Sequence, residues 1–195
     1  MRPICVAPQP PQPLPTDLSM PRLRLEIDYA RPVWTGRPVL GRLLRQAARK
    51  TLAPPHVLPE ALPNPDCAEV VIALKLTDDA EMRALNQQFR QIDKATNVLS
   101  FPSSDHEAIA ESSFLGDIAI GFETVQREAE RDEKQFSDHL AHLLVHGCLH
   151  LIGYDHQDRA EAEAMEAKEI AILADLGLAN PYADFDLVET MQQGA

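Results

Sequence analysis

Three histidines in the segment HGCLHLIGYDH, residues 146–156, have the types and spacing of metal ligands. His146 and His150 are four residues apart, so on a helix both imidazoles lie on one face, separated by about 6 Å of rise. Gly153 can take a left-handed conformation and end that helix, which lets the chain turn back and bring His156 to the same point. Three neutral imidazoles leave the fourth position of a tetrahedral zinc ion open for water, as in catalytic sites. The segment predicts one Zn²⁺ whose bound water has a pKa lowered to about 7.

Clustering of the histidines favours a metal site over coincidence. The chain has seven histidines, and four of them fall between His142 and His156. His142 lies one turn before His146 and is either a partner of the site or an ordinary helix histidine. Cys148 points about 200° away from His146 around the helix, so we expect it in the core rather than on the metal. Structural roles are expected for His56, His106 and His139.

The same spacing, H-x-x-x-H-x-x-G-x-x-H, occurs in metzincin proteases. In those enzymes a glutamate follows the first histidine and serves as the general base, whereas here that position is Gly147 and no Met-turn is evident after the motif. Peptide hydrolysis would lack its proton acceptor. A metalloprotease or amidase is therefore the weaker alternative.

Hydrophobic periodicity predicts the elements that must position this motif. Strands are predicted over residues 22–29, 68–76, 97–101 and 114–122, and helices over residues 38–52, 79–90, 123–134, 136–152 and 159–176. We expect an α+β fold with a four-stranded mixed sheet packed with helices. Its metzincin-like metal helix, residues 136–152, is apolar enough to be buried and ends at the glycine turn.

Length and composition indicate one domain of ordinary size. The chain has 195 residues, of which 45% are hydrophobic and 25% charged, so a core can form without disulfides or a structural metal. We expect a single catalytic metal-binding domain over residues 22–180. Residues 1–21 are proline-rich and predicted to form a disordered tail, and residues 181–195 are predicted to form a C-terminal tail.

Cysteine usage and hydropathy favour a soluble cytoplasmic protein. The three cysteines are an odd number without C-x-x-C spacing, which argues against a disulfide framework and a cysteine-based zinc finger. The N-terminus lacks the continuous apolar segment of a signal peptide, and no run of about 18 apolar residues occurs. We therefore expect a reducing compartment and no contact with a membrane.

The segment HGCLHLIGYDH resembles the signature metal motif of the YbeY family of bacterial endoribonucleases. The similarity extends through LNQQFRQIDKATNVLSFP, residues 85–102, and LGDIAIG, residues 115–121, and covers roughly residues 22–178. The proline-rich tail is a departure from the family. The resemblance implies a zinc-dependent, single-strand-specific endoribonuclease that acts in ribosomal RNA processing, notably at the 3′ end of the small-subunit RNA, and in ribosome quality control.

The family has a functionally important arginine in the segment that corresponds to residues 85–102, and this arginine corresponds to Arg90. A guanidinium fork can bind the non-bridging oxygens of a phosphodiester, where negative charge develops during attack. The alternative is a salt bridge at a helix C-terminus, where the helix dipole favours a cation. Thr96, Asn97 and Ser100 either line the same cleft or have turn and strand-edge roles.

The proposed chemistry is metal-assisted phosphodiester hydrolysis, in which zinc polarises a phosphoryl oxygen or supplies hydroxide from its bound water. No protein base is identified. Asp155 either orients an imidazole, accepts a proton or belongs to a plain turn; Asp117, unexpected inside a strand, either caps a loop or holds a ligand histidine. If the 2′-hydroxyl attacks instead of water, the products carry 2′,3′-cyclic phosphates.

The net charge of −12 opposes binding to a polyanion. An RNA hydrolase therefore requires basic residues gathered at the cleft, or a partner such as the ribosome or its proteins. Candidates for a basic patch are Arg22, Arg24, Arg42, Arg45, Arg49 and Lys50, which otherwise belong to a solvated face. A ribosome-associated binding protein with a structural zinc is the remaining alternative.

Overall fold

The computed structural model describes residues 21–57, 69–103, 114–156 and 158–183. Its elements in chain order are β1 (Arg22–Tyr29), the 3₁₀ helix η1 (Pro32–Trp34), α1 (Pro38–Thr51), β2 (Glu69–Thr77), α2 (Asp79–Arg90), β3 (Val98–Pro102), β4 (Phe114–Gly121), α4 (Phe122–Arg131), α5 (Phe136–Leu151) and α6 (Arg159–Asp175). Every predicted strand and helix is present with bounds that agree within three residues. The short helix η1 was not predicted.

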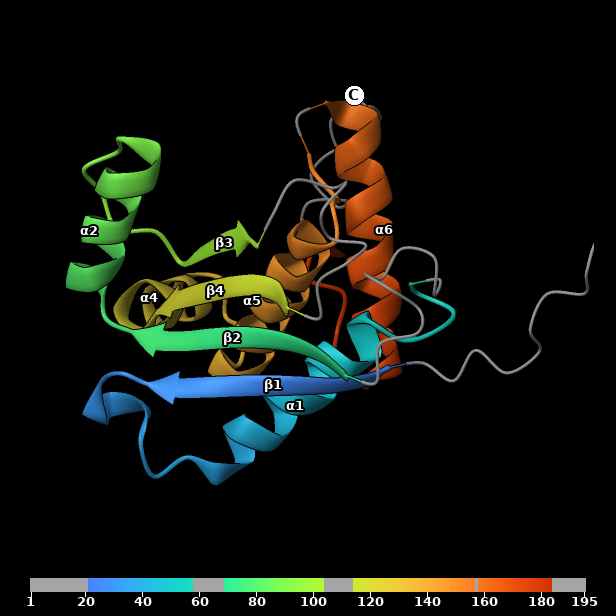
Figure 1. The fold of residues 1–195 in the computed structure, drawn as a ribbon, viewed down its shortest axis with the longest axis horizontal. Coiled ribbons are helices and arrows are strands. Elements are labelled where there is room, and N and C mark those ends of the chain that lie inside the picture. Colours follow the sequence, from blue (N-terminus) through green and yellow to red (C-terminus); the bar gives the residue numbers. More distant parts are fainter. Residues whose placement is uncertain (1–20, 58–68, 104–113, 157, 184–195) are drawn as a thin grey trace, which may run out of the picture.

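The four strands form one sheet in the order β1-β2-β4-β3. Strands β1, β2 and β4 are parallel, and β3 runs antiparallel to β4. The predicted four-stranded mixed sheet is therefore confirmed. Figure 1 shows β1 and β3 at the two opposite edges, with β1 lowest and β3 highest. The edge formed by β3 is the one that meets the helix of the histidine motif.

The two faces of the sheet are covered unequally, because side chains alternate along a strand. One face packs into the main core with α1 and α5 through apolar residues of β2 and β4 such as Leu74 and Ile118. On the opposite face Met82 of α2 packs with Leu99 and Ala119 in a small second cluster. Helix α2 thus covers only the β3–β4 side of that face.

Helix α5 is the central helix of the main core, as its apolar sequence predicted, and it packs against α1, α4, α6, β3 and β4. Gly147 determines how closely it approaches the sheet. A Cβ atom at this position would lie 3.1 Å from Ile118 Cδ1 and 3.1 Å from Ser100 Oγ. The absence of a side chain therefore allows α5 to lie directly on β3 and β4, which brings its histidines beside the β3 edge.

Helix η1 places Trp34 at one end of the core. Trp34 is fully buried, and its ring lies 5.1 Å from Phe122 and 5.9 Å from Phe136, measured between centroids. Its indole N–H donates to the carbonyl of Thr77 at 2.9 Å. These contacts join the end of β2 to the starts of α4 and α5.

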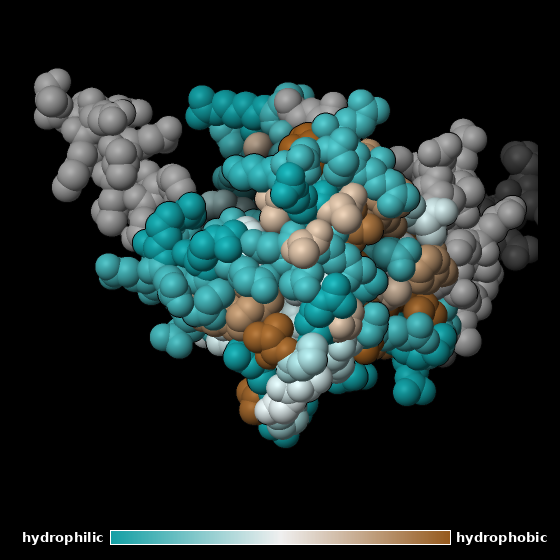
Figure 2. All heavy atoms as spheres, turned by 90° about the vertical axis from the view of Figure 1, so that its left-hand side faces the viewer, coloured by the Kyte–Doolittle hydropathy of each residue, from teal (hydrophilic) through white to brown (hydrophobic). Residues whose placement is uncertain are grey.

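Both predicted tails lie mostly outside the described residues, which begin at residue 21 and end at residue 183. Tyr182 falls beyond the predicted domain limit at residue 180 but contacts α6. Figure 2 shows a face on which hydrophilic side chains predominate and hydrophobic ones occur in small separate groups. Among the described helices, none combines the length and apolar character needed to cross a membrane.

Candidate metal centre

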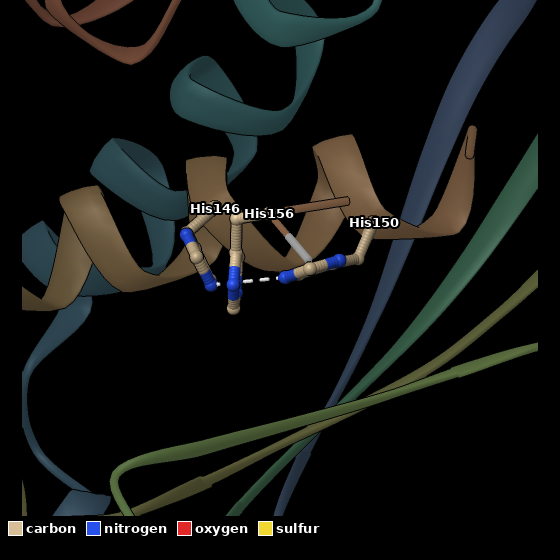
Figure 3. Close-up of side chains that lie close together, drawn as sticks. All are labelled: His146, His150 and His156. Atoms are coloured by element: carbon tan, nitrogen blue, oxygen red, sulfur yellow. Dashed lines mark hydrogen bonds between the residues drawn. The ribbon is translucent and has the colours of Figure 1, made fainter. Parts of the chain in front are cut away.

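The three motif histidines converge on one point beside the last turns of α5. His146 Nε2 and His150 Nε2 are 3.1 Å apart, and with a ring nitrogen of His156 they form a group whose atoms all lie within 4.8 Å of one another. Figure 3 shows the three imidazoles directed toward a common centre. Two nitrogens bound to one zinc ion at 2.0–2.1 Å in tetrahedral geometry are about 3.4 Å apart. The donor set therefore fits a single zinc-sized cation.

A glycine turn at the end of α5 delivers the third histidine, as predicted. Gly153 has φ +91°, its N–H donates to the carbonyl of His150 at 3.0 Å, and Tyr154 N–H donates to the carbonyl of Leu149 at 3.1 Å. This hydrogen-bond pattern is a Schellman motif, which ends a helix and reverses the chain. Asp155 Oδ1 then accepts from the backbone N–H of His156 at 2.8 Å. That contact favours the turn role for Asp155.

Electrostatics around the cluster favour a neutral imidazole at His150. Burial lowers the pKa of His150 below its usual value, and the neighbouring charges of His146 and His156 lower it further. Neutral imidazole is the form that binds a metal ion.

A buried carboxylate contacts the cluster from α6. Glu169 accepts hydrogen bonds from His146 Nδ1 at 2.7 Å, from His142 Nε2 at 2.8 Å and from the hydroxyl of Tyr182. Its side chain is 1% exposed. Burial alone would raise the pKa of Glu169, but the hydrogen bonds from His142 and His146 outweigh it and lower the pKa to about 2. His142 therefore contacts the site indirectly, through Glu169, and being a partner of the site is one of its two predicted roles.

Sequence reasoning missed Glu169, although a signal for it exists. Glu169 occupies the apolar stripe of α6, at helical spacing from Met165, Ile172 and Leu173, which are all buried. A charged residue in such a stripe requires a polar partner in the core. The carboxylate predicted as a possible holder of a ligand histidine, Asp117, is instead exposed on the sheet face turned away from α5, since its strand neighbour Ile118 packs into the main core. The suggestion that Asp117 holds a ligand histidine is wrong for this reason.

The histidine cluster opens into a cleft of about 560 Å³ that Arg90, Thr96, Asn97 and Ser100 also line. Arg90 is the last residue of α2, and the predicted alternative of a salt bridge is not observed with any other described residue. Its neighbour on the same helix, Arg83, is by contrast paired with Asp93 at 2.5 Å. An unpaired guanidinium in the cleft remains available to an anionic ligand.

Asn97 lines the cleft but already has hydrogen-bond partners at the start of β3 and on α4. Its Oδ1 accepts from the backbone N–H of Val98 at 2.7 Å, and its Nδ2 donates to Glu128 at 2.9 Å. The strand-edge role therefore explains Asn97. Ser100 faces α5 at the position where Gly147 comes closest to β3.

Gly147 and Cys148, the two residues that follow His146, point away from the histidine cluster. Cys148 is fully buried in the main core, and burial raises the pKa of its thiol to about 12. Gly147 faces β3 and β4, so the position that carries the general base in metzincins is closed by packing. The core role predicted for Cys148 is confirmed.

The predicted basic patch does not lie at the cleft. Arg22, Arg24, Arg45 and Arg49 line a separate pocket of about 150 Å³ between β1 and α1, at the sheet edge opposite β3. Arg24 is paired there with Glu26 and Glu69, and Lys50 is paired with Asp175. These residues therefore cannot offset the negative net charge at the histidine cluster itself.

Comparison with known proteins matches residues 47–177 to the family described as Endoribonuclease YbeY, a range that includes Arg90 and all three motif histidines. A protein named Endoribonuclease YbeY from Rhodopseudomonas palustris (strain HaA2) is 53% identical over 135 residues, 66% of this chain and 69% of the relative. Another of that name, from Bradyrhizobium sp. (strain BTAi1 / ATCC BAA-1182), is 44% identical over 186 residues, 90% of this chain and 96% of the relative. The solution structure of TM1509 from Thermotoga maritima is similar with a TM-score of 0.47 at 23% identity, covering 78% of this chain and 91% of that one. The family match and the level of identity show that this chain belongs to the YbeY endoribonuclease family.

Proposed function

We propose that this protein is a zinc-dependent, single-strand-specific endoribonuclease of ribosomal RNA processing, including maturation of the small-subunit RNA 3′ end and ribosome quality control. The observation that carries the proposal is the presence of three convergent histidines and an unpaired arginine in one cleft. The family supports RNA as the substrate, because its members carry the name endoribonuclease.

His146, His150 and His156 are the residues that hold the metal in this proposal. Imidazole nitrogens suit zinc, and the separation of 3.1 Å between His146 Nε2 and His150 Nε2 is close to that expected for two ligands of one ion. When bound, zinc supplies a Lewis acid and makes hydroxide available near neutral pH. His150 contributes by remaining neutral, because burial and the neighbouring charges of His146 and His156 lower its pKa.

Arg90 binds the phosphate in this proposal. Its planar guanidinium presents paired N–H donors that match two non-bridging oxygens, and it strengthens its hold as charge develops on them. Thr96 and Ser100 line the same cleft, and their hydroxyl groups can donate hydrogen bonds to the RNA strand. In this proposal these groups contact phosphate and sugar rather than base edges, which agrees with cleavage that does not depend on one base sequence.

The protease alternative is disfavoured by Gly147. A Cβ atom at this position would lie 3.1 Å from Ile118 Cδ1 and from Ser100 Oγ, so the packing of α5 on β3 and β4 leaves no room for a glutamate side chain. The structural-zinc alternative is disfavoured by the open cleft and by the burial of Cys148 on the core side of α5. A structural zinc site normally has four protein ligands, and the described residues supply three.

The negative charge of the chain bears on how the RNA is presented. Since the arginines at β1 and α1 lie away from the cleft, we propose that the ribosome or its proteins supply the remaining cationic contacts in the cytoplasm. A bound ribosomal RNA is already neutralised by cations and proteins, which reduces the repulsion that a free strand would meet.

The decisive experiment combines metal content with cleavage of a labelled single-stranded RNA and its duplex. We expect about one zinc per chain and cleavage of the single strand by the wild type. His150→Ala is expected to lose both metal and cleavage. Arg90→Ala is expected to keep the metal and to lose cleavage, by roughly 100-fold for the loss of one charge-stabilising donor.

Arg83→Ala is the matched control for Arg90→Ala, because both arginines are on α2 but Arg83 is exposed and paired with Asp93. It should retain wild-type cleavage. Analysis of the product ends distinguishes 2′,3′-cyclic phosphates, from attack by the 2′-hydroxyl, from linear ends, from attack by water. Cleavage that persists in metal-free protein would exclude the proposed role of zinc and favour a binding protein instead.

A further inference from the structure

Glu169 is a buried carboxylate to which no function has yet been assigned. It lies on α6, 23 residues after His146, and its side chain is 1% exposed. Taking a carboxylate out of water is costly unless hydrogen bonds compensate for the lost hydration. Glu169 receives three of them, from His142, His146 and Tyr182, which come from α5 and from the segment after α6.

The contact with His146 determines which ring nitrogen of that histidine carries the proton. An ionised carboxylate can only accept hydrogen bonds, so the Nδ1 atom at 2.7 Å from Glu169 must be the donor. A neutral His146 with its proton on Nδ1 has its free lone pair on Nε2. That is the atom which faces His150 Nε2 at 3.1 Å in the centre of the cluster (Figure 3).

His142 and Tyr182 hold the other oxygen of the carboxylate. His142 Nε2 donates to Glu169 Oε2 at 2.8 Å, and the tyrosine hydroxyl donates to the same oxygen. His142 Nδ1 is buried without a hydrogen-bond partner among the described residues, and the group of histidines that could share a metal ion consists of His146, His150 and His156. The oxygen Oε1 is thereby left to His146 alone.

We propose that Glu169 is a positioning residue for the metal site, which fixes the tautomer and ring orientation of His146 and is itself held by His142 and Tyr182. The inference rests on the proposed metal site. A carboxylate that receives the second N–H of a ligand histidine raises the basicity of the ligand, and removal of such a partner typically weakens metal binding 10–100-fold. Tyr182, which lies beyond the predicted domain limit, then contributes to the metal site through Glu169.

The test measures zinc affinity of the full chain by competition with a chromophoric chelator. Glu169→Gln keeps the size of the side chain and removes its charge, and it is expected to weaken zinc binding about 10–100-fold. Tyr182→Phe should weaken it less, because two donors to Glu169 remain. Glu166→Gln is the matched control, since Glu166 lies on the same helix but is exposed, and it should bind zinc as the wild type does.

Two spectroscopic readouts separate positioning from a merely structural tie between α5 and α6. Cobalt(II) absorption bands report the ligand field, and they should shift in Glu169→Gln but not in Glu166→Gln. Long-range ¹H–¹⁵N correlations of the metal-free wild type should show His146 protonated on Nδ1. The second measurement needs no variant, so it holds even if Glu169→Gln does not fold.

Zinc affinity of a folded Glu169→Gln protein equal to that of Glu166→Gln would overturn the inference, as would a metal-free His146 protonated on Nε2. Neither result depends on RNA cleavage. A wild-type protein that binds zinc but cuts no RNA would refute the proposed function and leave the role of Glu169 intact.

Discussion

Two of the histidine–carboxylate pairs on helix α5, His139–Glu128 and His146–Glu169, are alike in composition and different in geometry. His139 meets Glu128 of α4 through Nε2 at 2.8 Å, whereas His146 meets Glu169 of α6 through Nδ1 at 2.7 Å. In the first pair the remaining nitrogen, Nδ1, is buried without a partner among the described residues. In the second pair the remaining nitrogen is the outer Nε2, which faces the cleft. The two pairs therefore differ in which ring nitrogen is hydrogen-bonded to the carboxylate. A carboxylate bonded to Nδ1 leaves Nε2 free to bind a metal, whereas the pair bonded through Nε2 has only a structural role.

The largest difference between the pairs should appear when each histidine is removed. His146→Ala is expected to weaken zinc binding by roughly 1,000-fold, because one of three ligands is lost. This factor corresponds to about 4 kcal/mol, or about one third of the 10–16 kcal/mol typical of zinc sites. His139→Ala should leave zinc affinity unchanged and should destabilise the fold by about 1–3 kcal/mol, because Glu128 loses a hydrogen-bond partner. Calorimetric zinc titration and chemical unfolding measure the two effects. Equal loss of affinity in both variants would break the comparison.

Acid stability should distinguish the two carboxylates next. The pKa of Glu169 is about 2 in the folded chain against an ordinary value of 4.5, so between these values the unfolded state binds more protons. Metal-free protein should therefore lose stability as pH falls from about 4.5 toward 2, and Glu169→Gln should make this slope less steep by removing the contribution of Glu169. The pKa of Glu128 is also lowered, through its hydrogen bond from His139 against the opposing effect of burial, and Glu128→Gln should remove a smaller part. Urea unfolding at stepped pH gives both slopes.

Packing beneath the second pair gives a third, smaller effect. Gly147→Ala places a Cβ atom 3.1 Å from Ile118 Cδ1 and from Ser100 Oγ, which forces α5 away from the sheet at a cost of about 1–3 kcal/mol. The shift acts one residue from His146 and two turns from His139. Zinc affinity should therefore fall while the His139–Glu128 pair keeps its ring chemical shifts. An unchanged zinc affinity would show that the site tolerates displacement of α5.

Cys148→Ala should have the smallest effect. The thiol is fully buried and its pKa is raised to about 12, so it contributes packing and no ligand. A loss of about 1 kcal/mol in the free energy of unfolding is expected, with zinc affinity equal to that of the wild type. A change in the cobalt(II) spectrum of this variant would assign the thiol to the metal after all.

Prediction from sequence succeeded where the controlling interactions are local. The bounds of α5, its end at Gly153 and the convergence of His146 and His150 follow from helical periodicity and from the conformational freedom of glycine. The N-terminus of α2 is stabilised by an equally local interaction, since the carboxylate of Asp78 accepts from the N–H of Glu81 three residues on. Such features depend on residues within about one turn of each other.

Prediction failed where one position had to be matched with a distant one. The choice of Asp117 as a possible holder of a ligand histidine could not be tested without knowing which face of β4 meets α5. The arginines of β1 and α1 were plausible at the cleft until the strand order put β1 at the edge opposite β3. Helix η1 was missed because its stability comes from burial of Trp34 against Phe122 and Phe136 rather than from local propensity.

The sequence by itself therefore determined the predicted strands and α-helices, the family resemblance and the three histidines that lie together, because these depend on spacing along the chain. Only the tertiary structure decided that Glu169, 23 residues from His146, takes its Nδ1 atom, and that Arg90 reaches the same cleft from α2. The physical reason is that hydrogen bonds and charge act over a few ångströms of space. Whether two groups from different elements come within that range depends on how the whole core packs.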